Sequence, residues 1–281
     1  MTVPAAGSLG PVAPSVWVAT SRRYATTSTV VVGRDGGALV VDPAWDADEL
    51  AGIAAGLRGL GLTCAAGLAT HIHYDHVLWH PDLDRPPRFS SPWTAWAAEA
   101  RRAQVLAPLV GDLPDELLEL AGRLVPVRGG REPSSVPDPA RGGVGTLPPA
   151  YELPWAGHEV LLHEHDAHAP AQLAVEIADL RVLVAGDMLS DVELPMPDPA
   201  NPDLEAYLQG LDRLAEVAAR CDLLIPGHGT PTSEPLSRVD ADRRYLDNLL
   251  TGGDSDDPRK WLPDMADLHA ANVRRAAAHG P

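Results

Sequence analysis

The sequence predicts an α/β fold in which two blocks of β-strands, each followed by helices, form a two-sheet sandwich with the helices outside. Three observations support this prediction: β-branched runs occur in both halves of the chain, segments of helical periodicity follow each block, and histidine or aspartate stands directly after several strand-like runs. The 281 residues, 45% of them apolar and 22% charged, suffice for one large domain with a substantial core.

The first third of the chain alternates short apolar runs with tight turns. Residues 15–21 and 29–33 are β-branched runs, and an RDGG turn leads into a further strand at 38–43. A helix is predicted at 46–61, because apolar residues recur at helical spacing and a glycine ends the segment. Residues 64–70 then form an apolar strand that runs directly into a histidine-rich stretch.

The middle of the chain is predicted to be helical and then irregular. Helices at 91–106 and 115–125 precede residues 126–150, which are rich in Pro, Gly and Ser and predict a loop. The remaining elements are expected as strands at 158–164, 172–178 and 181–187, a helix at 203–219, a strand within 221–229, and helices at about 236–251 and 260–278.

The charge and the cysteines limit the partners and the compartment. A net charge of −17 disfavours nucleic acid and anionic membranes, whose phosphates most of the surface would repel, so we expect a small-molecule substrate. No apolar run is long enough to span a bilayer, and the N-terminus lacks the pattern of a signal peptide. Cys64 and Cys221 each begin an apolar run and are predicted to be buried free thiols, which favours a cytoplasmic location.

The stretch ATHIHYDHVLWHP, residues 69–81, combines histidines with an aspartate at the end of a predicted strand. Residues i and i+2 of a strand share a face, so His71 and His73 can address one metal ion. Asp75 and His76 follow where the chain turns, and approach the same space from another direction. Imidazole and carboxylate are ligands for Zn and Fe, so this H-x-H-x-D-H pattern predicts donors for two neighbouring cations rather than a solvated turn.

Further donors are predicted at the ends of other strands. The stretch LLHEHDAHAPAQLAV contains His163, His165 and His168. Asp187 is the last residue of the segment 181–187, directly after its apolar strand, and His228 ends another strand. Taken singly, Asp187 would most often be a helix cap and His228 a turn histidine. Three strand-terminal donors from distant parts of the chain are a far more specific indication of a metal site.

These motifs, THIHYDH, HAP before a strand, AGD after one and PGHG after another, resemble in this order the metallo-β-lactamase-fold hydrolase superfamily over about residues 15–235. The resemblance implies a four-layer αββα sandwich in a single domain spanning 1–281. It also implies that the region at about 91–150 is an insertion that covers the substrate as a lid, with C-terminal helices at about 236–280. Members include β-lactamases, lactonases, glyoxalase II-type thioesterases, persulfide dioxygenases and nucleases, so the resemblance leaves the substrate open.

The resemblance also implies two divalent metal ions per chain, with Zn²⁺ expected and Fe or Mn as alternatives. The implied ligands are His71, His73 and His168 for the first ion, Asp75, His76 and His228 for the second, and Asp187 as the bridge between them.

His168 is chosen over His165 because relatives commonly have this ligand in an H-x-P-x stretch just before a strand, which HAPAQLAV reproduces. His165 is the replacement if His168 is wrong, and otherwise His163 and His165 are expected to be exposed strand residues. Glu164 stands where relatives often carry a further histidine. Asp42, in VVDP, resembles the strand-end aspartate that supports the ligands from behind, with a simple turn carboxylate as the alternative.

The implied reaction uses a hydroxide held between the two ions to cleave a small-molecule ester, lactone, thioester or amide, with Asp75 orienting the nucleophile and passing a proton to the leaving group. The alternatives are a mononuclear iron oxidoreductase of the persulfide dioxygenase type, and a phosphodiesterase or nuclease, which the acidic surface disfavours. Tyr74, Trp79, His80, Met188 and Leu189 are positioned to line a pocket, although simple packing explains each of them equally well.

Overall fold

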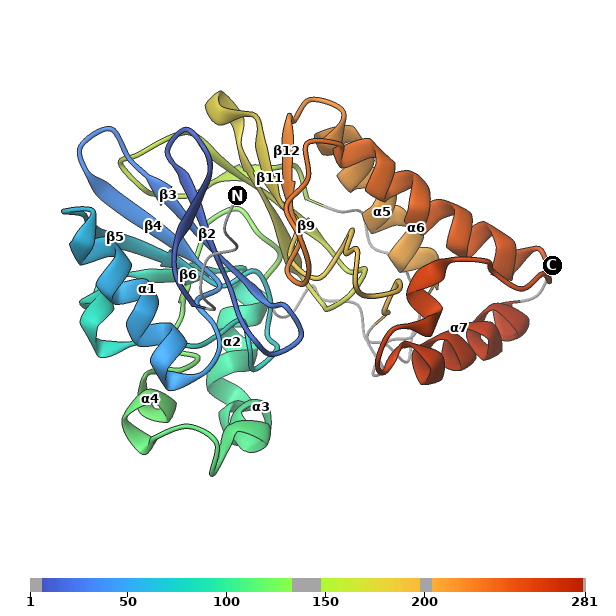
Figure 1. The fold of residues 1–281 in the computed structure, drawn as a ribbon, viewed down its shortest axis with the longest axis horizontal. Coiled ribbons are helices and arrows are strands. Elements are labelled where there is room, and N and C mark those ends of the chain that lie inside the picture. Colours follow the sequence, from blue (N-terminus) through green and yellow to red (C-terminus); the bar gives the residue numbers. More distant parts are fainter. Residues whose placement is uncertain (1–6, 133–147, 198–203, 280–281) are drawn as a thin grey trace.

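The computed structural model describes residues 7–132, 148–197 and 204–279. Two β-sheets face each other and helices cover their outer faces, with α1 on one side and α5 and α6 on the other (Figure 1). This arrangement confirms the predicted four-layer αββα sandwich. No helix of the described residues is both long and apolar enough to cross a membrane.

The first sheet follows the order of the sequence. Its strands within the described residues are β1 (Gly10–Ala13), β2 (Val16–Thr20), β3 (Thr27–Val32), β4 (Gly37–Val41), β5 (Thr63–Leu68), β6 (Arg88–Ser90) and β7 (Val125–Pro126). Strands β1 to β4 pair antiparallel, and β4 to β7 pair parallel. Because parallel strands end at the same edge, the residues that follow β4 and β5 become neighbours.

The second sheet has the strand order β12-β11-β10-β9-β8. Its strands are β8 (Tyr151–Glu152), β9 (Val160–His165), β10 (Gln172–Ile177), β11 (Val182–Val184) and β12 (Leu223–Ile225). Only β11 and β12 are parallel, and β10 pairs antiparallel with both β9 and β11. The turn from β9 to β10 therefore lies at the same edge as the ends of β11 and β12.

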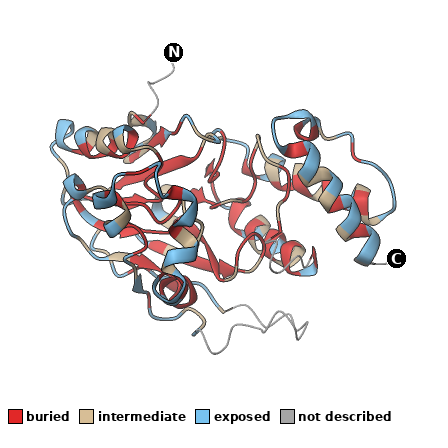
Figure 2. Ribbon diagram, turned by 90° about the horizontal axis from the view of Figure 1, so that it is seen from below, coloured by how far each residue is buried: buried red, intermediate tan, exposed pale blue. Residues whose placement is uncertain are grey.

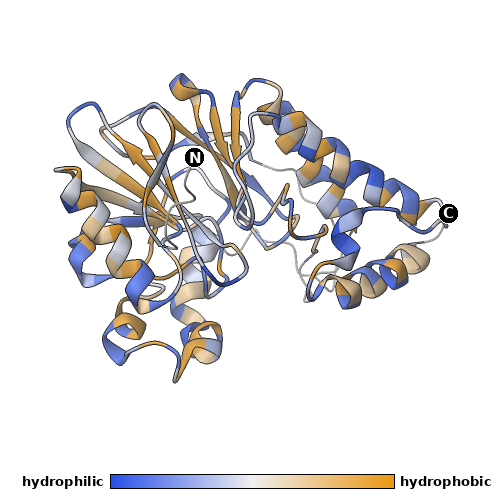
Figure 3. Ribbon diagram, in the orientation of Figure 1, coloured by the Kyte–Doolittle hydropathy of each residue, from blue (hydrophilic) through white to orange (hydrophobic). Residues whose placement is uncertain are grey.

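Alternation along the strands builds the core between the sheets. On β4, Leu39 and Val41 belong to the cluster between the two sheets, whereas Ala38 and Val40 pack against α1 (Ala47–Gly59). Successive side chains of a strand point to opposite faces, so one strand serves both layers. Figure 2 shows the strands buried in red beneath helices with exposed faces, and Figure 3 shows the same strands as the most apolar part of the chain.

The remaining helices are α2 (Pro92–Ala100), α3 (Arg102–Leu106), α4 (Asp115–Leu120), α5 (Leu204–Ala218), α6 (Pro235–Leu250) and α7 (Met265–His279). Side chains of α5, α6 and α7 form one buried cluster with the outer face of the second sheet. Helix α5 contributes an apolar stripe that includes Tyr207, Leu211 and Leu214. Cys64 and Cys221 are buried and free, as predicted.

Several sequence-based boundaries are wrong. The helix predicted at 91–106 is divided into α2 and α3 at Arg101, whose backbone leaves the helical region (φ −115, ψ 18). The helix predicted at 115–125 ends at Leu120, because Gly122 takes a left-handed conformation (φ +65) and the chain then forms β7. The C-terminal helix begins at Met265 rather than 260, after a short 3₁₀ turn at Pro258–Trp261.

Three strands of the first sheet were not predicted: β1, β6 and β7, the last of which falls where the predicted helix meets the predicted loop. Strand β1 has the sequence GPVA and β6 has RFS, and neither is long enough to show an alternating apolar pattern. Pairing with β2 and β5 makes them strands, so tertiary context decides their structure. Of the predicted loop at 126–150, residues 133–147 lie outside the described residues, and the lid remains a prediction.

Leu173 of β10 is 0% exposed and lies in the cluster between the sheets. Replacing it by alanine should lower the free energy of unfolding by about 2–5 kcal/mol, because the substitution leaves a cavity between two rigid sheets. Chemical denaturation followed by circular dichroism measures the change. The control is Leu236→Ala, at a residue of α6 that is 47% exposed, which should change the free energy of unfolding by only about 0.5 kcal/mol. A similar loss of unfolding free energy in both variants would contradict this description of the core.

Candidate metal centre

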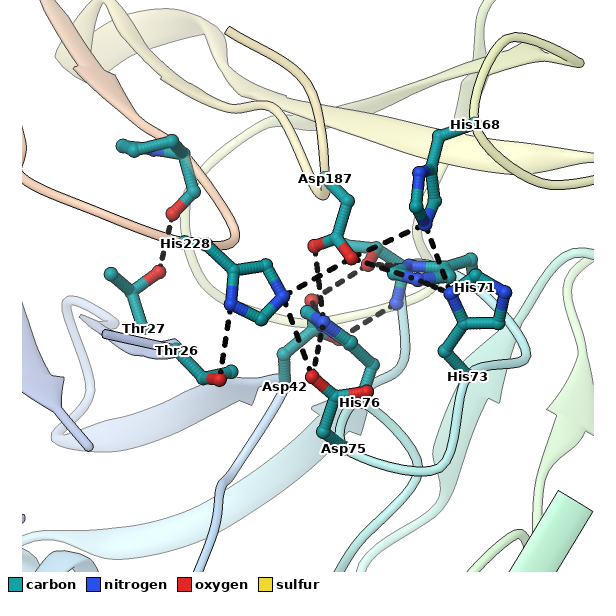
Figure 4. A network of polar contacts seen from close by, with 12 residues as sticks. Thr26, Thr27, Asp42, His71, His73, Asp75, His76, His168, Asp187 and His228 are labelled. Atoms are coloured by element: carbon teal, nitrogen blue, oxygen red, sulfur yellow. Dashed lines mark hydrogen bonds and ion pairs between the residues drawn. The ribbon is translucent and has the colours of Figure 1, made fainter. Parts of the chain in front are cut away.

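Three strand ends and one turn deliver side chains to a common point between the sheets (Figure 4). The segment after β5 carries four of them, the turn between β9 and β10 carries one, and the segments after β11 and β12 carry one each. The structure thus brings together all the residues predicted as ligands: His71, His73, Asp75, His76, His168, Asp187 and His228.

The first group of donor atoms belongs to His71, His73, His168 and Asp187. Nδ1 of His73 lies 3.1 Å from Nε2 of His71 and 2.9 Å from Nε2 of His168. Oδ2 of Asp187 lies 3.4 Å from Nε2 of His71 and 3.3 Å from Nε2 of His168. Ligand atoms about 2.0–2.2 Å from a tetrahedral zinc ion are about 3.3–3.6 Å apart, so these spacings come close to those of a zinc site.

The second group belongs to Asp75, His76 and His228. Oδ2 of Asp75 is 3.4 Å from Nε2 of both His76 and His228. Asp187 reaches this group as well: its Oδ1 is 3.1 Å from Nε2 of His76 and its Oδ2 is 3.2 Å from Nε2 of His228. The Asp187 carboxylate therefore contacts imidazole nitrogens of both groups, as a bridging ligand must.

Hydrogen bonds on the far side of the rings set the tautomers of the histidines. Three rings donate from Nδ1 to an oxygen that can only accept: His76 to Asp42 Oδ2 (2.9 Å), His168 to the Met196 carbonyl (2.9 Å) and His228 to the Tyr24 carbonyl (3.0 Å). The proton is therefore on Nδ1, and Nε2 of the neutral ring directs its lone pair into the cluster. This is the orientation in which histidines bind metal ions.

Two buried polar atoms of the cluster indicate that a cation fits between them. Nε2 of His76 and Oδ1 of Asp187 are 3.1 Å apart, yet within the described residues neither has a hydrogen-bond partner. A lone pair facing a carboxylate oxygen is repulsive unless a proton or a metal ion lies between them, and an unsatisfied buried polar atom costs about 1–3 kcal/mol. The donor set, nitrogen with carboxylate oxygen, is one that zinc accepts.

Asp42 and Thr70 hold two of the ligands from behind. Asp42 is buried, and it accepts hydrogen bonds from the Thr70 amide (2.8 Å), the Thr70 hydroxyl (2.7 Å) and His76 Nδ1 (2.9 Å). Because the Thr70 hydroxyl donates to Asp42, its oxygen is left to accept from Nδ1 of His71 at 3.0 Å. Asp42 therefore supports the ligands and is not a simple turn carboxylate. The sequence analysis missed Thr70; its place directly before the H-x-H pattern was the only signal.

The electrostatics of the cluster favour positive charge. Burial raises the pKa of Asp187, but the neighbouring imidazoles of His228 and His76 outweigh burial and hold it well below its ordinary value. Burial lowers the pKa of His76, whereas the charges of Asp187 and Asp75 raise it well above its ordinary value. Burial, aided by His76, lowers the pKa of His71 to about 3. Asp187 is thus ionised and His71 neutral, the states that metal binding needs, while a metal ion and a proton compete for His76.

The PGHG turn after β12 is shaped by glycines. A Cβ atom on Gly227 would lie 2.1 Å from Oδ1 of Asp187, so only glycine allows the bridging carboxylate to approach this backbone. Gly229 has a left-handed conformation (φ +115), and a Cβ there would lie 2.0 Å from Oδ1 of Asp191. The two glycines that flank His228 therefore leave room for the carboxylates of Asp187 and Asp191.

A sequence model of the metallo-β-lactamase superfamily matches residues 22–228, well over half of the chain. The chain belongs to the metallo-β-lactamase superfamily. The match includes all seven predicted ligands, with His228 as its last residue. It spans the strands of both sheets from β3 to β12.

Solved structures of the superfamily have the same fold. A β-lactamase domain protein from Burkholderia ambifaria has a TM-score of 0.58 at 20% sequence identity, over 89% of this chain and 76% of that one. A metallo-β-lactamase from Pontibacter korlensis has a TM-score of 0.56 at 17% identity, over 83% of this chain and 98% of that one. No curated protein is significantly similar to this chain in sequence.

His163 and His165 are buried, so the prediction that they are exposed strand residues is wrong. They lie on the face of β9 that α5 covers: a Cβ on Gly210 of α5 would lie 3.2 Å from Nδ1 of His165. His163 Nε2 donates to the Glu176 carboxylate on the neighbouring strand at 2.7 Å. His165 lies on the opposite face of the sheet from Leu162, which packs between the sheets, and the structure brings His168 rather than His165 to the candidate metal site.

Of the residues expected to line a pocket, most pack in the core. Trp79 is buried against Gly67, and Nδ1 of His80 accepts from the Asp82 amide to cap a short 3₁₀ turn. Met188 and Leu189 belong to the cluster beneath the C-terminal helices. Tyr74 is half-buried, and its ring meets that of Trp45 edge-on at 5.3 Å beside the metal site.

Glu164, which stands where relatives often carry a histidine, has a structural role in the described residues. Its side chain is fully buried and accepts hydrogen bonds from the Tyr151 hydroxyl (3.1 Å) and the Arg131 amide (3.0 Å), and its second oxygen is paired with the Arg131 guanidinium. The sequence analysis assigned no role to Arg131 or Tyr151, because their partner lies on a distant strand.

The Gly227→Ala variant should lose metal, because the added methyl group displaces the Asp187 carboxylate. We expect the purified variant to bind at most one ion per chain and fewer ions than the wild type, as measured by elemental analysis, with its fold retained by circular dichroism. Gly59→Ala is the matched control, since a Cβ there meets nothing within 4 Å. Full metal content in Gly227→Ala would contradict the placement of Asp187.

The Asp42→Asn variant should weaken metal binding by about 10–100-fold, the usual effect of removing a hydrogen-bond partner that orients a ligand. The asparagine keeps the shape of the side chain but cannot accept from both Thr70 and His76 as a carboxylate does. Titration with a competing chelator measures the affinity. An unchanged affinity would mean that Asp42 only supports the turn.

Proposed function

We propose that this chain is a binuclear metal-dependent hydrolase that cleaves a small-molecule ester, lactone, thioester or amide, with Zn²⁺ as the expected metal. The observation that carries the proposal is the shared carboxylate: the two oxygens of Asp187 contact imidazole nitrogens of both donor groups. A single ion would leave one complete donor set without a cation.

The charge of the site supports two cations. The side chains of Asp42, Asp75 and Asp187 are only 3%, 9% and 5% exposed, and among the described residues their ion-pair partners are histidines alone. Buried carboxylates without a lysine or arginine partner are costly. Two divalent ions would compensate these charges, and histidines in the neutral state would then act as ligands.

Two bound zinc ions would supply a hydroxide nucleophile at neutral pH and polarise the carbonyl of the substrate. The chain itself supplies the proton transfer and the orientation. Asp75 is the residue that we assign to proton transfer: burial raises its pKa, but His76 and His228 hold it below its usual range, so the carboxylate is ionised and can accept a proton. Tyr74 and Trp45 form an apolar wall beside it.

The first test of the proposal measures the metal content of the protein and the effect of removing the Asp187 carboxylate. Wild-type protein should hold two zinc ions per chain, and Asp187→Ala should hold at most one and lose at least about 10³-fold in kcat/KM, because neither oxygen of the bridge remains. His80→Ala is the matched control: this histidine lies in the same motif but caps a 3₁₀ turn, so both metal content and activity should persist. A single ion in the wild type would contradict the binuclear proposal.

A panel of lactone, thioester, ester, amide, phosphodiester and β-lactam substrates decides the reaction class. We expect hydrolysis in one of the first four classes. Oxygen uptake with a thiol persulfide by the iron-loaded protein, without hydrolysis, would instead establish the mononuclear iron oxidoreductase. Phosphodiester cleavage alone would establish the nuclease alternative.

A further inference from the structure

A cavity lies on the side of α6, outside the candidate metal centre. Its volume is about 460 Å³, within the range of small-molecule sites. One wall is a face of α6, the other is the segment 255–259 that leads to α7, and Ser190 and Asp191 complete the lining. None of the seven predicted metal ligands lines it.

Helix α6 places two arginines in this cavity, Arg238 and Arg244. Arg244 is exposed and forms no close ion pair among the described residues, although its charge helps to lower the pKa of Asp257, which also lines the cavity. Arg238 is only 20% exposed and pairs with Asp191 at 3.1 Å. In a chain with a net charge of −17, a cavity arginine whose guanidinium forms no close ion pair can hold an anion, because the guanidinium fork matches carboxylate and phosphate oxygens.

The acidic residues of the lining do not cancel this charge inside the cavity. Asp257 accepts from Arg259 Nη2 (2.7 Å), and Asp191 accepts from the Thr230 amide (2.8 Å) as well as pairing with Arg238. Asp256 is exposed. Burial and the nearby Arg259 lower the pKa of Arg238, so additional negative charge here would be stabilised.

Two neutral groups are placed to complete such a site. Ser255 is 2% exposed, and its oxygen accepts from the Asp257 amide at 3.2 Å, which leaves the hydroxyl proton to donate. Asn248 lines the cavity from α6, one turn beyond Arg244. Hydroxyl and amide groups add directional hydrogen bonds to the charge of the arginines.

We propose that this cavity binds a small organic anion, whose carboxylate or phosphoryl group is held by Arg244 and Arg238 with Ser255 and Asn248 as further donors. The volume exceeds what an oxyanion alone needs, so the rest of the ligand occupies the space toward Tyr245 and Pro258. The proposal is independent of the reaction at the metal centre.

The floor of the cavity is hydrogen-bonded to the segment that carries His228. Ser190 Oγ donates to the His228 carbonyl at 2.8 Å, and Asp191 holds the Thr230 amide. Arg259 in turn donates to the Ser190 carbonyl at 2.8 Å. A ligand that engages Arg238 therefore acts on Asp191, which accepts a hydrogen bond from Thr230, two residues after the predicted metal ligand His228.

The test measures binding to metal-loaded protein by isothermal titration calorimetry with two matched pairs of probes. Glucose 6-phosphate is compared with glucose, and benzoate with benzyl alcohol, so that the pair with the larger difference identifies the oxyanion. We expect one anionic probe to bind and its neutral partner not to bind. Arg244→Gln and Arg238→Gln should each weaken that binding by about 10-fold or more, the effect of losing one charge-assisted hydrogen bond.

Arg243→Gln is the matched control, because Arg243 neighbours Arg244 on α6 but pairs with Asp212 at 2.5 Å and does not line the cavity. It should bind the probe as the wild type does, and Asp256→Asn should bind it at least as well. Metal content and circular dichroism verify that each variant is folded.

Three results would overturn the proposal. The first is that neither anion binds. The second is that Arg244→Gln leaves the binding unchanged, which would place the anion elsewhere, such as at the metal centre; the third is that Arg243→Gln weakens the binding equally, which would indicate non-specific attraction. A weaker affinity in Asp256→Asn would overturn the assignment of a purely anionic ligand. Since no turnover is measured, these outcomes leave the hydrolase proposal untouched.

Discussion

The Asp187 carboxylate lies where side chains from both sheets meet. The geometry of the site depends on what compensates its negative charge. Imidazole lone pairs from both donor groups approach its two oxygens within 3.1–3.4 Å. Such an arrangement is stable only with positive charge between the donors, because buried carboxylates and lone pairs repel one another. The protein therefore maintains, at a cost in stability, a site that a cation would stabilise.

The sandwich provides the rigidity that this arrangement requires. Strands β4 and β5 are parallel, and so are β11 and β12, so the segments that follow them leave the sheets at the same edge. The apolar cluster between the sheets keeps the two edges in register, and glycine at 227 lets the turn after β12 approach Asp187 without a steric clash. The Asp42 carboxylate and the carbonyls of Met196 and Tyr24 then accept hydrogen bonds that set the tautomers of His76, His168 and His228.

The sequence predicted the strands with clear alternation and missed those without it. Residues 38–43 and 172–178 were predicted as strands because their apolar character is local, whereas β1 and β6 are strands only through pairing with their neighbours. His163 and His165 were predicted to be exposed because alternation gives the face on which a residue lies, but not what covers that face. Helix α5, some forty residues later, covers it.

For the candidate site, the sequence by itself determined the kind of donor and their clustering from His71 to His76. Strand periodicity does not explain their convergence, because β5 ends at Leu68 and residues 70–76 form bends and a turn. The tertiary structure decided which distant residues join that pattern. It brought His168 rather than His165 to the cluster, because His165 lies on the face of β9 that α5 covers, whereas His168 lies in the turn after that strand. It also decided that Asp42 and Thr70 hold the ligands, since hydrogen bonds between strand ends depend on the register of the sheet, which no local stretch of sequence contains.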